Sequence, residues 1–185
     1  MHRLVASKQV TPLPSEQDAE MYEATMEILE HHGFEHYEVS NYAKNGFACK
    51  HNNNYWNHSN YLSFGPSAHS YWNNGDAKRW WNIFNLSTYA QKIFSKELPI
   101  SGEEILSEEQ CFDERIMLGL RSDGIDYVAL QKDFHYDFLT ERQHLISELL
   151  ANDLVNFFNN KLRLTNKGFL LCEEITQRLL TRVSV

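Results

Sequence analysis

The chain has 185 residues, of which 42% are hydrophobic and 13% aromatic, and its formal net charge is −8 at pH 7. The length is that of one domain or two small ones, and the composition excludes a disordered or low-complexity protein. The residues before and after Leu106 each carry a net charge of −4 without a basic stripe, which argues against a nucleic-acid partner.

The first predicted element is a helix that follows Pro14. Ser15 is its predicted N-cap, with Asp18 three residues further on, and Gly33 is its predicted stop. Four side chains share one face at helical spacing: Ala19, Tyr22, Met26 and Leu29. Residues 34–43 then predict a short buried strand, which gives the helix–loop–strand order of an α/β fold.

The stretch from Val39 to Gly75 differs in composition from the rest of the chain. It contains no Asp or Glu, and all four tryptophans lie between Trp56 and Trp81. Because it shows neither helical nor strand periodicity, we expect a long loop here, and its aromatic content argues against disorder. We interpret this loop as the functional region.

After this loop, residues 87–96 predict a helix, and residues 98–102 contain Pro and Gly and predict a linker. The domain boundary is therefore expected at residue 102. Residues 107–110 form a predicted capping box that begins a helix whose apolar face holds Phe112, Ile116 and Leu120. Residues 140–143 form a second predicted box, which begins a helix through Leu145, Leu149 and Leu150.

The end of the chain predicts a β-hairpin and a last helix. Residues 154–158 and 161–165 alternate apolar and polar side chains on either side of Asn159 and Asn160, which tolerate positive φ. Thr165 is the predicted cap of a helix that carries Phe169, Cys172, Ile175 and Leu179. Helices followed by a hairpin and a further helix predict a winged-helix-like module.

The most unusual local sequence is His51-Asn52-Asn53-Asn54-Tyr55-Trp56. A neutral imidazole ligates iron or zinc, aromatic faces stack on planar ligands, and amides orient either kind of group. The alternative is a buried polar loop whose side chains hydrogen-bond the backbone of their own turn.

Residues 61–70 follow, and their small side chains let a backbone approach a ligand closely, unless they only form a strand that ends in a Gly-Pro turn. His58 and His69 do not stand at a zinc-ligand spacing from His51. The three cysteines, about sixty residues apart, form neither a disulfide framework nor a CxxC pair. No segment is long and apolar enough for a membrane span or a signal peptide, so we expect a cytoplasmic protein without an integral membrane segment.

Three consecutive segments, residues 37–43, 51–56 and 61–70, resemble signatures of one protein group. They are similar to segments of HemW and oxygen-independent coproporphyrinogen III oxidases, which are radical S-adenosylmethionine (SAM) proteins. Residues 117–125 and 164–168 are similar to that group's C-terminal domain, so the resemblance covers almost the whole chain. The HNxxYW pattern at residues 51–56 points to the HemW branch.

The resemblance implies an α/β fold in which residues 1–102 form the end of a partial (β/α) radical-SAM barrel. Residues 103–185 would form a mainly helical, winged-helix-like domain of the HemN type. The family's CxxxCxxC motif is not found here, so the [4Fe-4S] cluster and SAM are expected only in a full-length protein. We therefore expect a C-terminal fragment that is inactive alone, and whether it belongs to an enzyme stays open.

The resemblance also implies roles for single residues. His51 is the candidate axial haem ligand and the only expected metal ligand. Three residues would shape its surroundings: Asn52, Tyr55 and Trp56. Four others would line the cofactor side of the barrel mouth: Ala43, Gly65, Ala68 and His69. Ser63 and Ser67 stand where many relatives carry Gly, which would narrow a close backbone approach.

The function implied is that of a HemW-type haem-binding chaperone that delivers haem. Its expected partners are haem or a porphyrin, the N-terminal barrel part and a haem-acceptor protein. One alternative is a fragment of an oxygen-independent coproporphyrinogen III oxidase, which decarboxylates porphyrinogen propionates oxidatively. Another is a non-catalytic module that binds a partner through the residues from Ser107 onward.

Overall fold

The computed structural model describes residues 7–12 and 14–181. Its helices are α2 (Ser15–His31), α3 (Lys50–Trp56), α4 (Leu86–Phe94), α5 (Glu108–Leu120), α6 (Tyr127–Phe134), α7 (Phe138–Glu141), α8 (Gln143–Ala151), α9 (Asn166–Leu170) and α10 (Cys172–Leu180). Its strands are β1 (Glu35–Glu38), β2 (Asn41–Ala43), β3 (His69–Asn73), β4 (Ala77–Asn82), β5 (Ile100–Ile105), β6 (Ile125–Asp126), β7 (Val155–Phe158) and β8 (Lys161–Leu164). These strands form three small sheets, β1-β2, β3-β4-β5 and β6-β8-β7, whose strand pairs are antiparallel.

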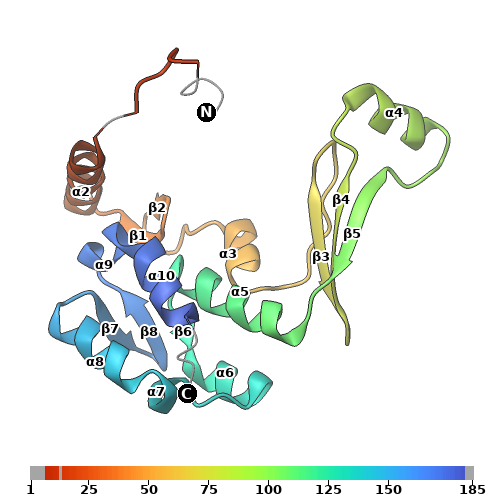
Figure 1. The fold of residues 1–185 in the computed structure, drawn as a ribbon. Coiled ribbons are helices and arrows are strands. Elements are labelled where there is room, and N and C mark those ends of the chain that lie inside the picture. Colours follow the sequence, from red (N-terminus) through yellow and green to blue (C-terminus); the bar gives the residue numbers. More distant parts are fainter. Residues whose placement is uncertain (1–6, 13, 182–185) are drawn as a thin grey trace.

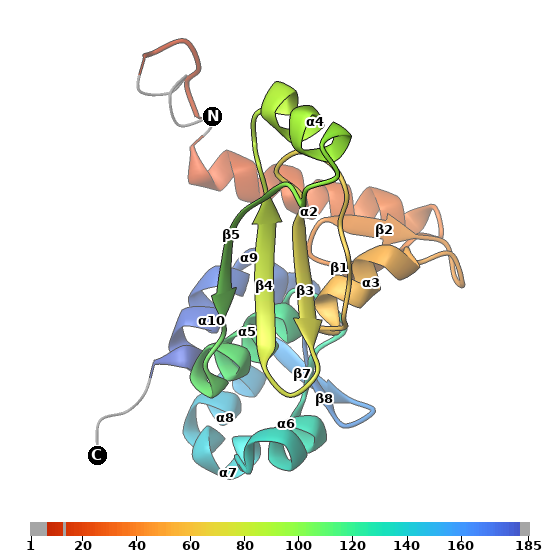
Figure 2. The ribbon, with the colours of Figure 1, turned by 90° about the vertical axis from the view of Figure 1, so that its right-hand side faces the viewer.

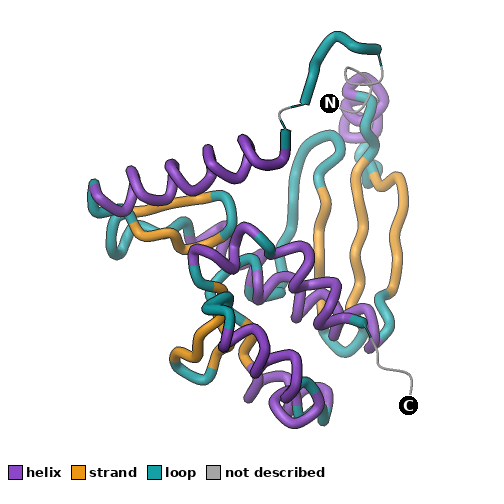
Figure 3. Tube along the Cα trace, turned by 60° about the vertical axis from the view of Figure 1, so that its left-hand side comes forward, coloured by secondary structure: helices purple, strands orange, loops and turns teal. Residues whose placement is uncertain are grey.

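The three-stranded sheet β3-β4-β5 projects from a mainly helical body, with α4 at the end far from that body (Figure 1). The body consists of α5 to α10 and the β6-β8-β7 sheet, and α2 with the β1-β2 hairpin lies on its other side (Figure 3). Viewed from the side opposite α2, the projecting sheet presents one broad face (Figure 2). Each face of this sheet therefore has different neighbours.

The main core lies in the helical body. Its fully buried side chains are Ile116, Leu120, Ile125, Leu130, Phe138, Leu149, Leu162, Ile175 and Leu179. The predicted apolar face of α5 is confirmed, because Ile116 and Leu120 are buried and Phe112 packs against them. The capping box of Ser107 and Gln110 is confirmed as well, with both of its hydrogen bonds formed.

The predicted hairpin at the C-terminal end is also confirmed. Strands β7 and β8 flank Asn159 and Asn160, whose φ angles are 48° and 61°. Gly168 of α9 packs tightly beside this hairpin, since a Cβ atom there would lie 2.0 Å from the carbonyl oxygen of Leu154. The predicted last helix is divided at Leu171 into α9, which Thr165 caps, and α10.

Near the N-terminal end, the predicted apolar face of α2 is confirmed, because Met26 is buried and the other three residues of this face, Ala19, Tyr22 and Leu29, are half-buried. Pro14, rather than Ser15, is the N-cap residue, and no side chain caps this helix. The single buried strand predicted for residues 34–43 is wrong, because β1 and β2 form a hairpin. Its turn is closed by the buried Glu38 carboxylate, which accepts hydrogen bonds from Ser40 N and the Asn41 side chain.

Three further predictions are wrong. Residues 98–102 are not a linker, because β5 begins at Ile100 and pairs with β4. Thr140 does not begin a helix, since it donates to Asp137, which caps the short α7. The region from residue 39 to 75 is not a long loop, because it contains β2, α3 and β3. Asn has a low helix propensity, so α3 depends on its tertiary contacts.

Candidate functional site

Strand alternation gives the β3-β4-β5 sheet two faces with different chemistry. On one face, which we call the body face, Tyr71 stacks on His58, and Arg79 donates a hydrogen bond to Glu114 of α5. On the other, which we call the cavity face, Ser70, Trp72 and Trp80 line a cavity. Trp80 and Trp81 are adjacent in β4, and only Trp80 lines this cavity.

A series of ring contacts connects α3 with the body face. The ring centroids of His51 and Tyr55 lie 4.9 Å apart, and those of Tyr55 and Tyr61 lie 4.3 Å apart. Tyr61 is 6.2 Å from Tyr71, which in turn stacks on His58 at 4.3 Å. His51 is exposed at the outer end of this series, so its imidazole is accessible to a ligand.

At the inner end of the series, a network of charged groups joins the sheet to α5. The Glu114 carboxylate lies 3.0 Å from His58 Nε2 and accepts a hydrogen bond from Arg79 Nη1 at 2.9 Å. Arg79 also donates to Glu104 of β5 at 2.6 Å. The hydrogen bond from His58 and the charge of Arg79 lower the pKa of Glu114, against the opposing effect of burial.

The predicted site residues do not come together in one place: some lie on α3, and others lie near α4 and the β3-β4-β5 sheet. His51 and Tyr55 are in contact on α3, whereas Gly65 lies near α4, where its N–H donates to the Tyr89 hydroxyl at 3.1 Å. Ala68 accepts a backbone hydrogen bond from β4, and His69 stacks on Trp81 at 5.9 Å on the body face.

The remaining predicted residues also lie apart from the Gly65 group. Ala43 ends β2, and Asn52 is half-buried on α3. Trp56 is half-buried, and its Nε1 is buried without a hydrogen-bond partner among the described residues. The eight residues therefore do not line one cavity in this chain.

The described residues do not fit an iron–sulfur cluster or a zinc site. Cys49 is exposed before α3, Cys111 is half-buried on α5, and Cys172 is buried on α10. Burial raises the pKa of the Cys111 and Cys172 thiols, which disfavours the thiolate that a metal needs. No group of three or more His, Cys, Asp or Glu side chains in residues 7–12 and 14–181 could hold a metal ion.

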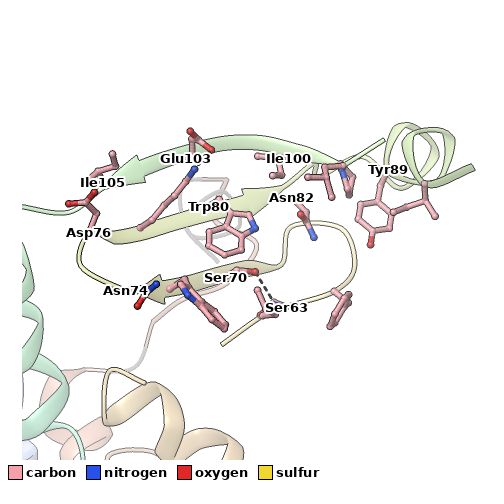
Figure 4. Close-up of a pocket in the computed structure, with 17 residues that line it drawn as sticks. Ser63, Ser70, Asn74, Asp76, Trp80, Asn82, Tyr89, Ile100, Glu103 and Ile105 are labelled. Carbon is pink, nitrogen blue, oxygen red and sulfur yellow. Dashed lines mark hydrogen bonds and ion pairs between the residues drawn. The ribbon is translucent and has the colours of Figure 1, made fainter. Parts of the chain in front are cut away.

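A cavity of about 710 Å³, which was not predicted from the sequence, lies on the cavity face (Figure 4). It lies between the sheet, α4 and residues 62–64. Three of its lining residues, Ile100, Glu103 and Ile105, belong to β5, which the linker expected at residues 98–102 obscured. None of the described helices has the length and apolar character needed to cross a membrane.

The chain is similar to known proteins over most of its length. The family model of the HemN C-terminal domain matches residues 106–171. The heme chaperone HemW of Bacillus subtilis (strain 168) is 31% identical over 163 residues, which are 88% of this chain and 42% of the relative. HemW of Lactococcus lactis (strain IL1403) is 34% identical over 91% of this chain and 44% of its own length.

A mitochondrial protein of Bos taurus, called radical S-adenosyl methionine domain-containing protein 1, is 30% identical over 89% of this chain and 39% of its own. Among solved structures, coproporphyrinogen III oxidase (HemN) from Escherichia coli superposes with a TM-score of 0.62. It covers 92% of this chain and 42% of that chain at 17% identity, which shows a shared fold of mixed helices and sheets. The chain thus spans less than half the length of these relatives: it matches HemW proteins over most of its own length, and its residues 106–171 match the HemN C-terminal domain.

Proposed function

We propose that this chain is the C-terminal part of a HemW-type radical SAM protein that binds haem and delivers it to an acceptor protein. The observation that carries the proposal is the exposed imidazole of His51 at the end of the ring series on α3. The name of the HemW relatives, heme chaperone, supports haem as the ligand. The cluster-binding N-terminal barrel part is its further proposed partner.

The residues around His51 suit a haem group. Haem iron is commonly held by an axial imidazole, and an exposed His51 can supply one. Tyr55 contacts the His51 ring edge-on at 4.9 Å and restricts its orientation. Asn52 and Trp56 lie on the same short helix. No acidic residue occurs from Val39 to Gly75, so haem propionates meet no carboxylate from this segment.

The other proposed cofactor residues are Ala43, Gly65, Ala68 and His69. In this chain the Gly65 N–H already donates to Tyr89, and its carbonyl accepts from Asn82. A direct backbone contact of Gly65 with SAM would require these hydrogen bonds to be exchanged. Ala43, at the end of β2, would line the cofactor side of the barrel mouth together with the other three residues in a full-length protein.

The C-terminal domain would act as a winged-helix-like module. Its order of elements, α5-β6-α6-α7-α8-β7-β8, and its strand order β6-β8-β7 support this comparison. We place its start at residue 103 and assign residues 1–102 to the end of the barrel. β5 crosses this boundary, since it runs from Ile100 to Ile105.

The test is a titration of the chain with haemin, followed by Soret absorption, in the wild type and in His51→Ala. The wild type should give a saturable, shifted Soret band, and His51→Ala should lose it because the axial nitrogen is removed. His144→Ala is the matched control, since His144 is also exposed on a helix, α8, and should change nothing. An unchanged spectrum in His51→Ala would remove His51 from the proposal.

The second candidate function is the oxidative decarboxylation of coproporphyrinogen, which the fold shared with HemN supports. The residues of this chain do not fit the [4Fe-4S] cluster, so no radical step is assigned to them. Anaerobic turnover of coproporphyrinogen by a full-length protein would favour the oxidase and argue against haem delivery.

A further inference from the structure

The cavity on the cavity face has the properties of a small-molecule site that is separate from His51. Its volume of about 710 Å³ lies within the range of roughly 300–1,000 Å³ of ligand pockets. Trp80 provides an aromatic surface on β4, and Tyr89 approaches from α4 (Figure 4). Ile93 of the same helix also lines the cavity. His51 is connected through its ring contacts to Tyr71 on the body face, so the two sites use opposite faces of the sheet.

Two hydroxyl groups in this cavity can donate hydrogen bonds to a ligand. Ser70 is 2% exposed, and its Oγ accepts a hydrogen bond from Ser63 N at 3.0 Å. The Tyr89 hydroxyl accepts one from Gly65 N at 3.1 Å. Neither hydroxyl proton has an acceptor among the residues that the structure describes. A buried hydroxyl of this kind favours a ligand that supplies an acceptor oxygen.

The charges along the cavity disfavour an anionic ligand. Lys78 and Glu103 form an ion pair at 2.8 Å, which neutralises both groups. Asp76 also lines the cavity and has no ion-pair partner within the described part of the chain. The lining therefore carries one excess negative charge, which would repel the propionates of a haem or porphyrin.

We propose that this cavity binds a flat, uncharged ring compound that carries a carbonyl oxygen, as a quinone does. The ring lies against the Trp80 indole, where offset stacking of aromatic rings is favourable. The carbonyl oxygen accepts a hydrogen bond from Tyr89 or Ser70. This binding is independent of haem binding at His51.

The probe for this proposal is menadione, a two-ring quinone, and the measurement is quenching of tryptophan fluorescence corrected for absorption by the probe. Quenching should be saturable, because Trp72 and Trp80 line the cavity. Ile93→Glu places a charge in the lining and should weaken binding at least about fivefold. Phe94→Glu is the matched control, since Phe94 is an exposed neighbour on α4 that does not line the cavity, and it should leave the affinity unchanged.

A second comparison tests the hydrogen bond between the cavity and the carbonyl oxygen of the ligand. 2-Methylnaphthalene has the same ring size as menadione without carbonyl oxygens, so it should bind more weakly and be insensitive to Tyr89→Phe. The Tyr89→Phe variant should weaken menadione binding, with circular dichroism confirming that it is folded. Linear quenching, equal effects of Ile93→Glu and Phe94→Glu, or equal binding of the two probes would each overturn the proposal. Competition by haemin would overturn the charge argument, whereas haem binding to His51 can fail without affecting this site.

Discussion

Replacing Glu114 by Gln tests whether the charged network holds the projecting sheet on α5. The substitution keeps the size of the side chain and removes its charge. In the wild type, the Glu114 carboxylate contacts both His58 and Arg79, which come from two different segments. Gln offers one uncharged oxygen in place of the two charged oxygens of Glu, so it cannot accept a hydrogen bond from each partner through a separate oxygen. Arg79 then loses one of the negative charges that neutralise it.

The expected cost follows from the burial of the three groups. The side chains of Glu114 and His58 are 19% and 9% exposed, and that of Arg79 is 31% exposed. Exposed ion pairs contribute about 0–1 kcal/mol and breaking a buried pair costs about 3–5 kcal/mol. We expect a loss of about 2 kcal/mol in the free energy of unfolding, or about 4–8 °C in Tm for a chain of this length.

The assay is thermal and urea unfolding followed by tryptophan fluorescence, because three of the four tryptophans lie in this sheet. Glu103→Gln is the matched control, since Glu103 pairs with Lys78 but is 56% exposed, and it should change stability by less than about 0.5 kcal/mol. Equal effects of the two substitutions would refute the proposal that Glu114 holds the projecting sheet on α5.

The same variant should show a dependence on pH. The pKa of Glu114 lies below its ordinary value of 4.5 in the folded chain, so the charged carboxylate stabilises the fold above that value. This contribution is lost as the pH falls through the lowered pKa. The stability difference between wild type and Glu114→Gln should therefore be largest near neutral pH and shrink below pH 4.5. A difference that grows on acidification would contradict this reasoning.

Two other predictions concern packing and thiol reactivity. Gly168→Ala should destabilise the C-terminal domain by about 3 kcal/mol in urea unfolding, because the new methyl group would collide with the Leu154 carbonyl; a change below about 0.5 kcal/mol would show that the contact relaxes at little cost. Of the three cysteines, Cys49 should react quickly with a thiol reagent at neutral pH, because it is exposed, whereas burial raises the pKa of Cys111 and Cys172. Rapid reaction of Cys172 in the folded chain would contradict its burial.

The elements predicted correctly are those whose signals are local. The capping box at Ser107 and the Asn159-Asn160 turn depend on residues within a few positions of each other, and both are formed. The helical face that contains Met26 is likewise set by the spacing of neighbouring residues. Local hydrogen bonds and periodicity were therefore sufficient for α2, α5 and the C-terminal hairpin.

The elements predicted wrongly depend on contacts between distant segments. β5 was obscured by Pro99 and Gly102, yet Gly102 lies where a Cβ would come within 2.5 Å of the Trp81 ring. The local sequence contains no information about Trp81, so it indicated a linker. The same limit applies to the site: the composition of residues 39–75 indicated a functional region, but only tertiary contacts place Gly65 near α4 and helix α3 beside α5.

The two ion pairs between β4 and β5 lie on opposite faces of the sheet. Lys78 pairs with Glu103 toward the cavity, and Arg79 pairs with Glu104 toward α5. Because successive side chains alternate, sliding β5 by one residue would move Glu103 to the α5 side and Glu104 to the cavity side, so each carboxylate would leave its present partner. Trp80 and Trp81 are successive residues of β4 and so present their indoles to opposite faces of the sheet, and an insertion or deletion in β5 would change which β5 side chains stand beside each indole.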